Sequence, residues 1–227
     1  MGSLRDLVGS AVAVYEADGQ YAGASFDSPY CAFLDQASRR LAGGGSLAEM
    51  MASGRWHCHE SCWTDASRVT VETGEPVDLQ GCRGGLNIYA APVVAEGQVI
   101  GSINFGYGTP PRDGSALGEV ARLYQVDPAD LARQARSVPE LPATLVHAAK
   151  GHLRVLADQL AELYLRRVAE DRLARAVVRL QDSEALLNQT QHLAGAGGWV
   201  WDVAEQAGYW TAETFRIHGL EPPHAPV

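Results

Sequence analysis

Runs of apolar and β-branched residues predict four strands in the first half of the chain. Ser10–Ala17 is followed by an Asp-Gly hairpin signal and then by a second run at Tyr21–Ser25. Leu86–Val94 and Val99–Tyr107 form a second pair, joined by a Glu-Gly turn. Strands that are joined by such short turns pair antiparallel, so the pattern favours an antiparallel sheet.

Helical spacing of apolar residues occurs between these two pairs and again after them. Tyr30–Ala42 carries its apolar residues on one face, and Trp63–Thr73 is predicted as a second helix. Prolines punctuate several short helices between Thr109 and Pro142. The predicted fold class is therefore α+β, an antiparallel sheet with flanking helices.

A much longer helix is predicted from Ala143 to Leu187, a stretch with no proline and a single glycine. Leucines from Leu153 to Leu163, and apolar residues from Leu173 to Leu187, follow spacings of three and four residues with a break between the two stripes. A helix of about 45 residues is about 65 Å long, which is unusual inside a globular core. We therefore expect a homodimer that pairs through residues 153–187. The alternative is a helical hairpin that closes on the first domain.

The last part of the chain reads as the opening of another domain. Trp199–Val203 and Tyr209–Thr211 are predicted strands, and Ala212–His218 is a predicted short helix. Two strands are too few to cover their own hydrophobic surface, so we expect a truncated module.

Composition narrows the class of protein. The chain has 227 residues, 46% of them hydrophobic, and a formal net charge of −9. The acidity disfavours sequence-independent binding to nucleic acid, which needs basic surface. No apolar run approaches the roughly 20 residues of a membrane span, and the start of the chain lacks the features of a secretory signal. We therefore expect a cytoplasmic protein with reduced thiols.

All four cysteines lie in one N-terminal stretch, which is the main candidate for chemistry. They are Cys31, Cys58, Cys62 and Cys82. Four thiolates suit an iron–sulfur cluster or tetrahedral zinc, and His57 and His59 are spare ligands. We expect a cofactor or metal site here, an iron–sulfur cluster first, and zinc or no cofactor otherwise. The alternative is that the cysteines are small buried hydrophobic residues.

A second candidate site is a pocket for an organic ligand. Asn87 and Tyr89 on one predicted strand, and Asn104 and Tyr107 on the next, place polar groups among apolar ones, and Trp63 is a candidate cap. A few polar groups in an apolar concavity are typical of small-molecule sites.

Catalysis has little support in the sequence, and we expect no enzyme. The chain has no G-x-S-x-G, Walker or H-E-x-x-H motif. The alternatives are a hydrolase that uses Cys62 with His57 or His59, and a zinc-stabilised structural domain.

The ordered motifs from about Gly9 to Tyr107 resemble the PocR sensory domain, a PAS-like ligand-binding module of bacterial regulators. The matching pieces are the early strand with its Asp-Gly turn, Tyr30-Cys31, Cys62-Trp63-Thr64-Asp65, Cys82-Arg83-Gly84-Gly85-Leu86 and Ala91-Pro92-Val93. Arg83 stands where the family usually has histidine, and Cys58 adds to three common cysteines. The resemblance implies a PAS-like sheet and a sensor of small molecules such as diols.

Leu187–Pro222 resembles the opening of a second, kinase-associated PAS domain, through Gly198-Trp199-Val200-Trp201-Asp202-Val203 and Phe215-Arg216-Ile217-His218-Gly219. The long helix resembles the signalling helices that join sensory domains to histidine kinases. These resemblances imply the sensory region of a bacterial signal-transduction protein of the histidine kinase type. They divide the chain into a sensory domain at 1–142, a signalling helix at 143–190 and a truncated PAS start at 191–227.

Overall fold

The computed structural model describes residues 11–26 and 28–221. Gly9 and Ser10, where the first resemblance and the first predicted strand begin, lie outside the described residues, as does Pro222.

Five antiparallel strands form the larger sheet, in the order β2-β1-β5-β4-β3. Their bounds are β1 (Ala11–Glu16), β2 (Tyr21–Phe26), β3 (Val77–Leu79), β4 (Asn87–Ala95) and β5 (Gln98–Tyr107). Both predicted hairpins are confirmed, and the pairing of β1 with β5 joins them into one sheet. The sequence did not predict β3, whose three residues are too few to show a period.

Helices fill the rest of the first part of the chain. They are α2 (Pro29–Ala42), α3 (Leu47–Ala52), α4 (His57–His59), η1 (Glu60–Ser67), α5 (Arg68–Thr73), α6 (Gly114–Tyr124), α7 (Pro128–Arg136) and α8 (Ala143–Ala194). The helix predicted from Trp63 begins at His57, because polar residues in its first turns hide the apolar period. The prediction also missed α3, although Ser46 and Glu49 form a capping box at its start.

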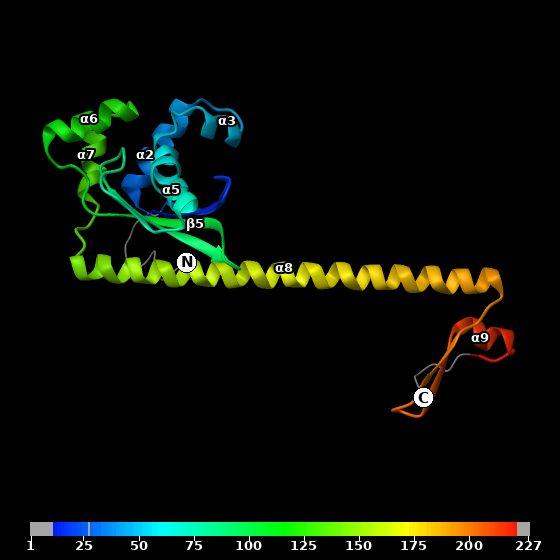
Figure 1. Cartoon of the computed structure of the whole chain (residues 1–227). Coiled ribbons are helices and arrows are strands. Elements are labelled where there is room, and N and C mark those ends of the chain that lie inside the picture. Colours follow the sequence, from blue (N-terminus) through cyan, green and yellow to red (C-terminus); the bar gives the residue numbers. More distant parts are fainter. Residues whose placement is uncertain (1–10, 27, 222–227) are drawn as a thin grey trace. The chain divides into compact units, whose positions relative to one another are not determined.

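The central strands present different side chains to the two sides of the sheet. Tyr89 on β4, with Phe105 and Tyr107 on β5, belongs to the core under α8. Ile88 and Ala90 on β4 belong to a separate core on the other face. Figure 1 shows α8 along one side of the sheet and α2, α5, α6 and α7 on the other. The predicted α+β class, with an antiparallel sheet and flanking helices, is confirmed, and it fits the PAS-like resemblance.

The first half of α8 packs against the sheet. Every fourth residue from Ala149 to Ala161 is buried there. Leu153, expected at the start of the dimer seam, is 0% exposed, and Leu156 and Leu160 pack against the same core. This part of the leucine stripe is therefore used within the chain.

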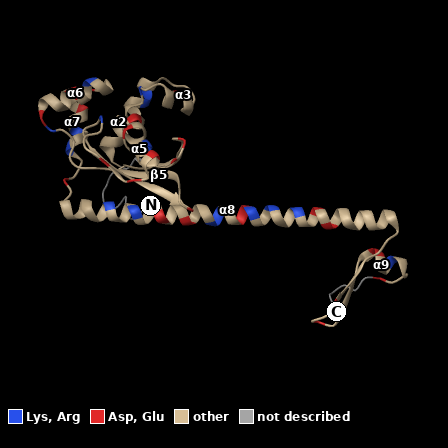
Figure 2. Ribbon diagram, viewed as in Figure 1, with Lys and Arg blue, Asp and Glu red and all other residues tan. Residues whose placement is uncertain are grey.

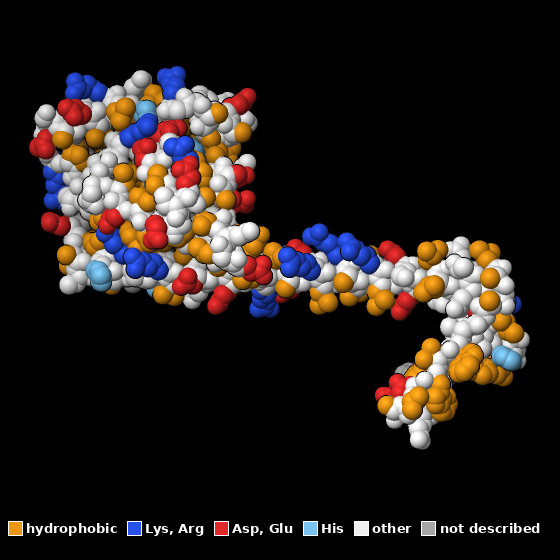
Figure 3. Space-filling model, viewed as in Figure 1, with side chains coloured by type: hydrophobic (Ala, Val, Ile, Leu, Met, Phe, Trp, Pro, Cys, Tyr) orange, Lys and Arg blue, Asp and Glu red, His pale blue; other side chains and the backbone are white. Residues whose placement is uncertain are grey.

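Beyond the sheet, apolar side chains of α8 face outward. Leu163, Leu173, Leu180 and Leu187 are each about 60% exposed (62, 66, 60 and 58%). Figure 3 shows apolar side chains on the surface of this part of the helix, and Figure 2 shows charges of both signs along it. Neither α8 nor any other helix within residues 11–26 and 28–221 is apolar enough over a sufficient length to cross a membrane.

The chain divides into two compact units, Met1–Leu165 and Arg166–Val227. The first extends past residue 142, because the start of α8 covers the sheet. The second holds the rest of α8 and a two-stranded sheet of β6 (Trp199–Asp202) and β7 (Ala207–Trp210), followed by α9 (Ala212–Ile217). The predicted strands and short helix are thus present.

Candidate functional site

A cavity of about 50 Å³ lies between the sheet and the helices on the face opposite α8. Its floor is the sheet, with Ala13 on β1, Ile88 on β4 and Asn104 on β5. Its walls are α2, α4, η1, the end of α6 and the loop between β3 and β4. The surface of the cavity is almost entirely apolar.

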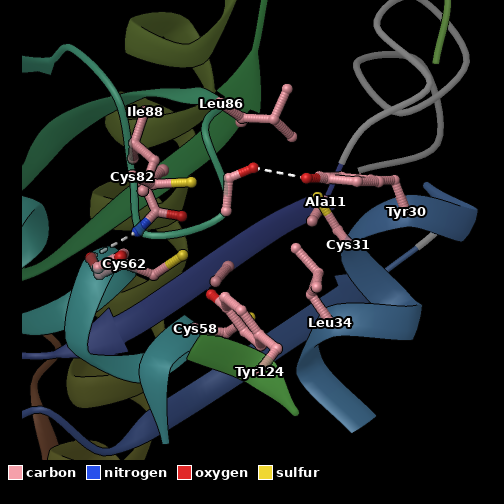
Figure 4. Close-up of a pocket in the computed structure, with 15 residues that line it drawn as sticks. Ala11, Tyr30, Cys31, Leu34, Cys58, Cys62, Cys82, Leu86, Ile88 and Tyr124 are labelled. Atoms are coloured by element: carbon pink, nitrogen blue, oxygen red, sulfur yellow. Dashed lines mark hydrogen bonds between the residues drawn. The ribbon is translucent and has the colours of Figure 1, made fainter. Parts of the chain in front are cut away.

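All four cysteines line this cavity, although they come from distant points of the sequence. Cys31 lies on α2, Cys58 on α4, Cys62 on η1 and Cys82 in the loop between β3 and β4. Figure 4 shows their side chains around the same space. All four are free thiols.

The start of α2 positions Cys31. Ser28 caps the helix, and its Oγ accepts a hydrogen bond from the Cys31 backbone N–H at 3.4 Å. Pro29 occupies the first turn, where its missing N–H costs nothing. The cap therefore fixes where the helix begins and which turn faces the cavity.

Cys58 and Cys62 lie on a continuous helical stretch whose middle is a π-helix, an uncommon form that is frequent at functional sites. Asn104 Nδ2 donates hydrogen bonds to the Cys62 carbonyl at 3.0 Å and to Ser67 Oγ at 2.9 Å. These two bonds tie the cysteine-bearing helix directly to the central strand β5.

Cys82 lies in a tight loop. Its backbone N–H donates to the Leu86 carbonyl at 2.5 Å, and Gly85 N–H donates to the Cys82 carbonyl at 2.7 Å. Burial raises the pKa of the Cys82 thiol, and the nearby backbone N–H groups of Gly84, Gly85 and Leu86 oppose that rise. A side chain at Gly84 has no room, because its Cβ would lie 2.7 Å from Leu34 Cδ1.

Burial makes all four thiols hard to ionise. Burial, together with the neighbouring Cys82, raises the pKa of Cys31 to about 12. Burial is also the largest cause of the raised pKa values of Cys58, Cys62 and Cys82. A nucleophilic cysteine needs a lowered pKa, so these thiols do not suit the hydrolase alternative.

The two histidines predicted as spare ligands do not line the cavity. His57 Nδ1 lies 3.2 Å from Arg83 Nη1. Burial lowers the pKa of His57, and the positive charge of the Arg83 guanidinium lowers it further. His59 is 3% exposed and stacks on Trp56 with ring centroids 5.2 Å apart. Burial lowers the pKa of His59, and its Nδ1 has no hydrogen-bond partner among the described residues.

Of the five residues predicted for an organic-ligand pocket, Asn104 alone lines the cavity. Tyr89 and Tyr107 lie on the opposite face of the sheet, in the core under α8. The proposed grouping of these three residues is therefore wrong, because side chains on a strand alternate between its faces.

The other two residues of that prediction serve local structure. Asn87 Oδ1 accepts a hydrogen bond from Gly81 N–H at 3.0 Å, which closes the loop before β4. Trp63 packs on Tyr15, with ring centroids 5.3 Å apart. Neither residue lines the cavity.

Three large side chains of the cavity wall escaped the sequence analysis as site residues. They are Tyr30, Leu34 and Tyr124. The Tyr124 hydroxyl lies 3.7 Å from Cys58 Sγ, and the Tyr30 hydroxyl donates to the Gly84 carbonyl at 2.7 Å. Helical periodicity marked Leu34 as a core residue, but nothing in the pattern near Tyr124 pointed to a cysteine 66 positions away.

The cysteines surround the cavity without converging on a single point. Among residues 11–26 and 28–221, no group of three or more His, Cys, Asp and Glu side chains is arranged to hold one metal ion. A preformed structural zinc site places four donors about 2.0–2.3 Å from one centre. The zinc-stabilised scaffold therefore finds no support in this geometry.

An antiparallel sheet with a recessed cavity on one face and a long helix on the other makes this part of the chain an α+β module with a candidate small-ligand site. The family model described as the sensory domain found in PocR matches residues 3–165, more than half of the chain, and the chain belongs to this family. No curated protein and no solved structure matches the chain. Family membership assigns the chain a ligand-sensing role in signalling.

Proposed function

We propose that this chain is the cytoplasmic sensory region of a signal-transduction protein of the histidine kinase type. The four-cysteine cavity is the sensing site, and α8 carries the state of the cavity toward the output. The chain itself performs no catalysis in this proposal.

One observation carries the proposal: a single sheet separates the cavity from α8. Asn104 on β5 lines the cavity, and its neighbours Ile103 and Phe105 belong to the core under α8. Asn104 Nδ2 also donates a hydrogen bond to the Cys62 carbonyl. A displacement of the cysteine-bearing helix therefore acts on β5 directly, and through β5 on the packing of α8.

Polar contacts also join this sheet to α8. Lys150 Nζ donates to Asp78 and, at 3.0 Å, to the Tyr107 hydroxyl, which itself donates to Asp78. One turn further along, Arg154 Nε donates to the Tyr89 hydroxyl at 2.8 Å. A helix held by directional bonds at two adjacent turns responds to a shift of the strands as a rigid element, which suits signal transfer.

The occupant of the cavity is a compact group. A volume of about 50 Å³ is well below the roughly 150 Å³ of an engineered protein cavity that binds benzene. A short diol or a small inorganic group bonded to the cysteines fits such a space better than a ring-sized organic ligand.

A second copy of the chain is the proposed partner of α8. The seam begins at Leu163 and continues through Leu173, Val177, Leu180 and Leu187, since the earlier leucines pack on the sheet. From Leu173 the stripe follows spacings of four and three residues, with Glu184 at the position before Leu187, and this pattern suits a two-stranded coiled coil. Movement of the two helices relative to each other then transmits the signal.

Hydrogen–deuterium exchange tests the relay. The cavity is filled either with 1,2-propanediol or by anaerobic reconstitution with iron and sulfide, and exchange is followed in peptides from residues 143–161. We expect a change in these peptides when either probe binds. Binding of a probe that leaves exchange throughout 143–161 unchanged contradicts the relay, whatever the chemistry of the occupant.

A further inference from the structure

The sulfur atoms of the cavity are a complete set, because the chain has four cysteines and all four line it. Cys31 lies on α2, Cys58 and Cys62 lie on the α4–η1 helix, and Cys82 lies in the loop between β3 and β4. Free cysteines also pack in cores as small apolar side chains, but here every cysteine of the chain borders the same void. Their meeting indicates that the sulfurs act together.

Several other polar groups of the cavity wall already have protein partners. Tyr30 OH donates to the Gly84 carbonyl, and Ser61 Oγ accepts from Arg83 N–H at 3.0 Å. Asn104 Nδ2 donates hydrogen bonds to the Cys62 carbonyl and to Ser67 Oγ. No His, Asp or Glu of the described chain lines the cavity. The sulfurs are thus its characteristic donors, and they favour an all-thiolate ligand over one held by hydrogen bonds.

The arrangement suits a cluster better than a single ion. One ion needs its donors gathered around one point, and no described residues form such a group. In a cluster with several irons, the thiolates bind different metal atoms, so their sulfurs stand around a space. Iron–sulfur clusters of both common types use four cysteines.

The volume of the cavity also favours a group that is bonded to the sulfurs. Sulfur bonds to a metal at about 2.3 Å, whereas non-bonded atoms stay about 3.5–4.0 Å apart. A group that is bonded to all four sulfurs therefore needs less empty volume than an organic molecule of equal atom count. The cavity of about 50 Å³ is compatible with a bonded occupant after small side-chain adjustments.

The loop around Cys82 supplies a further feature of a cluster ligand. Backbone N–H groups of Gly84, Gly85 and Leu86 lie near its sulfur and lower the pKa of the thiol against the effect of burial, and N–H groups near a coordinated thiolate stabilise its negative charge. Gly85 has φ +82°, and its absent Cβ would lie 2.4 Å from Pro111 Cδ. The turn that aims these N–H groups therefore depends on glycine.

We propose that Cys31, Cys58, Cys62 and Cys82 hold an iron–sulfur cluster in this cavity. This inference names the occupant of the proposed sensing site and rests on that site being used for sensing. Binding is a ligand exchange: each thiol releases its proton to solvent, and its sulfur replaces a water, hydroxide or small-thiolate ligand of an iron atom, which leaves to solvent. No electron moves when a preformed cluster is bound in this way.

The test is anaerobic purification of the whole chain, followed by reconstitution with equal amounts of ferrous and ferric iron and with sulfide, which supplies the electrons and atoms of a [4Fe–4S]²⁺ core. We expect visible absorbance and acid-labile sulfide in a ratio to iron near one. Cys58→Ala and Cys82→Ala each lower bound sulfide at least threefold. Ser53→Ala, at an exposed residue that does not line the cavity, removes no sulfur and keeps the wild-type amount.

Circular dichroism shows whether each variant is folded, and only folded variants are compared. A wild-type protein without labile sulfide after reconstitution overturns the inference, as does a colourless protein that holds one zinc ion. Equal sulfide in the wild type and the folded cysteine variants overturns it too. None of these results bears on the relay, because 1,2-propanediol tests α8 without any cluster.

Discussion

Asn104 and Tyr107 lie three residues apart on β5, and the odd spacing sends their side chains to opposite faces of the sheet. Asn104 reaches the cysteine cavity, and Tyr107 packs under α8. The sequence places both on the correct strand, so alternation alone was enough to separate them. Polarity suggested a shared pocket, but a single polar side chain on a strand can equally serve a cavity or a helix contact.

Ala13→Val tests the cavity at the level of one side chain. Ala13 is 3% exposed, lines the cavity and pairs with Asn104 across the strands. Two added methyl groups occupy part of the void and suit a strand, so we expect stability to be unchanged or higher by about 1 kcal/mol. We also expect reconstituted iron to fall several-fold. Thermal unfolding and iron analysis measure the two effects.

Ala24→Val is the matched control, because Ala24 pairs with Ala13 on the neighbouring strand and is exposed. It leaves the amount of bound iron unchanged. A clear loss of stability in Ala13→Val would mean that the wall is already fully packed, and would remove the case for an occupant.

The raised thiol pKa predicts how the cluster-free protein responds to pH. Burial lifts the pKa of Cys31 from 9.0 to about 12, so the folded state holds this proton more tightly than the unfolded state. The associated stability is present in full below pH 9 and is lost as the pH rises toward 12. We expect Tm to fall as the pH rises from about 9 toward about 12, and to fall less in Cys31→Ala. If Tm falls equally with pH in the wild type and in Cys31→Ala, the Cys31 thiol does not have the raised pKa that its burial implies.

At the scale of elements, α8 has two different surfaces along one helix. Its first half lies on the sheet and bonds to it through Lys150 and Arg154. Its second half exposes leucines at coiled-coil spacing. The leucine pattern is similar in both halves, which is why the sequence assigned them one partner. Only the position of the sheet distinguishes intramolecular packing from a free stripe.

Lys150→Met tests the attachment of α8 to the sheet. The substitution keeps the aliphatic stem but removes the bonds to Asp78 and Tyr107. We expect a loss of about 1 kcal/mol in the free energy of unfolding, because the partners are only partly exposed. Exchange in residues 143–161 becomes faster. Chemical denaturation and exchange mass spectrometry provide the measurements.

Arg166→Met is the corresponding control on the same helix. Its ion pair with Glu170 is largely exposed, and such pairs contribute little. If the two variants lose equal stability, the contacts of Lys150 have no special role in holding α8.

Leu180→Glu tests the proposed dimer seam. Leu180 is 60% exposed and belongs to the stripe, so a charge there opposes pairing and light scattering should report a monomer. Val178 is 54% exposed but lies off the stripe. Val178→Glu should leave the dimer intact. A monomeric wild type, or equal effects of the two variants, contradicts the seam.

At the scale of the molecule, the cavity joins segments that are far apart in the sequence. Cys31 and Leu34 come from α2, Cys58 and Cys62 from the α4–η1 helix, and Tyr124 from α6. The short helices after β5 look like a linker in the sequence, yet α6 and α7 share a core with α2. α6 completes the wall of the site through Tyr124, and α7 packs in the same core, so the sensory unit needs both.

Loading the cavity should therefore protect several distant segments together. We expect slower hydrogen exchange in Pro29–Ala42, 57–67, 80–88 and Gly114–Tyr124 after reconstitution, since a bound group stabilises every element that it contacts. α3 contributes no lining residue and serves as the internal control. Protection confined to one of the four segments would show that iron binds at the surface instead.

The sequence by itself determined the order of the elements, the two hairpins and the long helix, because these depend on local periodicity, turn residues and the absence of proline. It also singled out the four cysteines, through their clustering. The tertiary structure alone decided that these cysteines meet at one cavity while His57 and His59 do not, and that the leucines of α8 divide between the sheet and solvent. Those outcomes depend on which surfaces pack together, and that is set by contacts between residues distant in the chain.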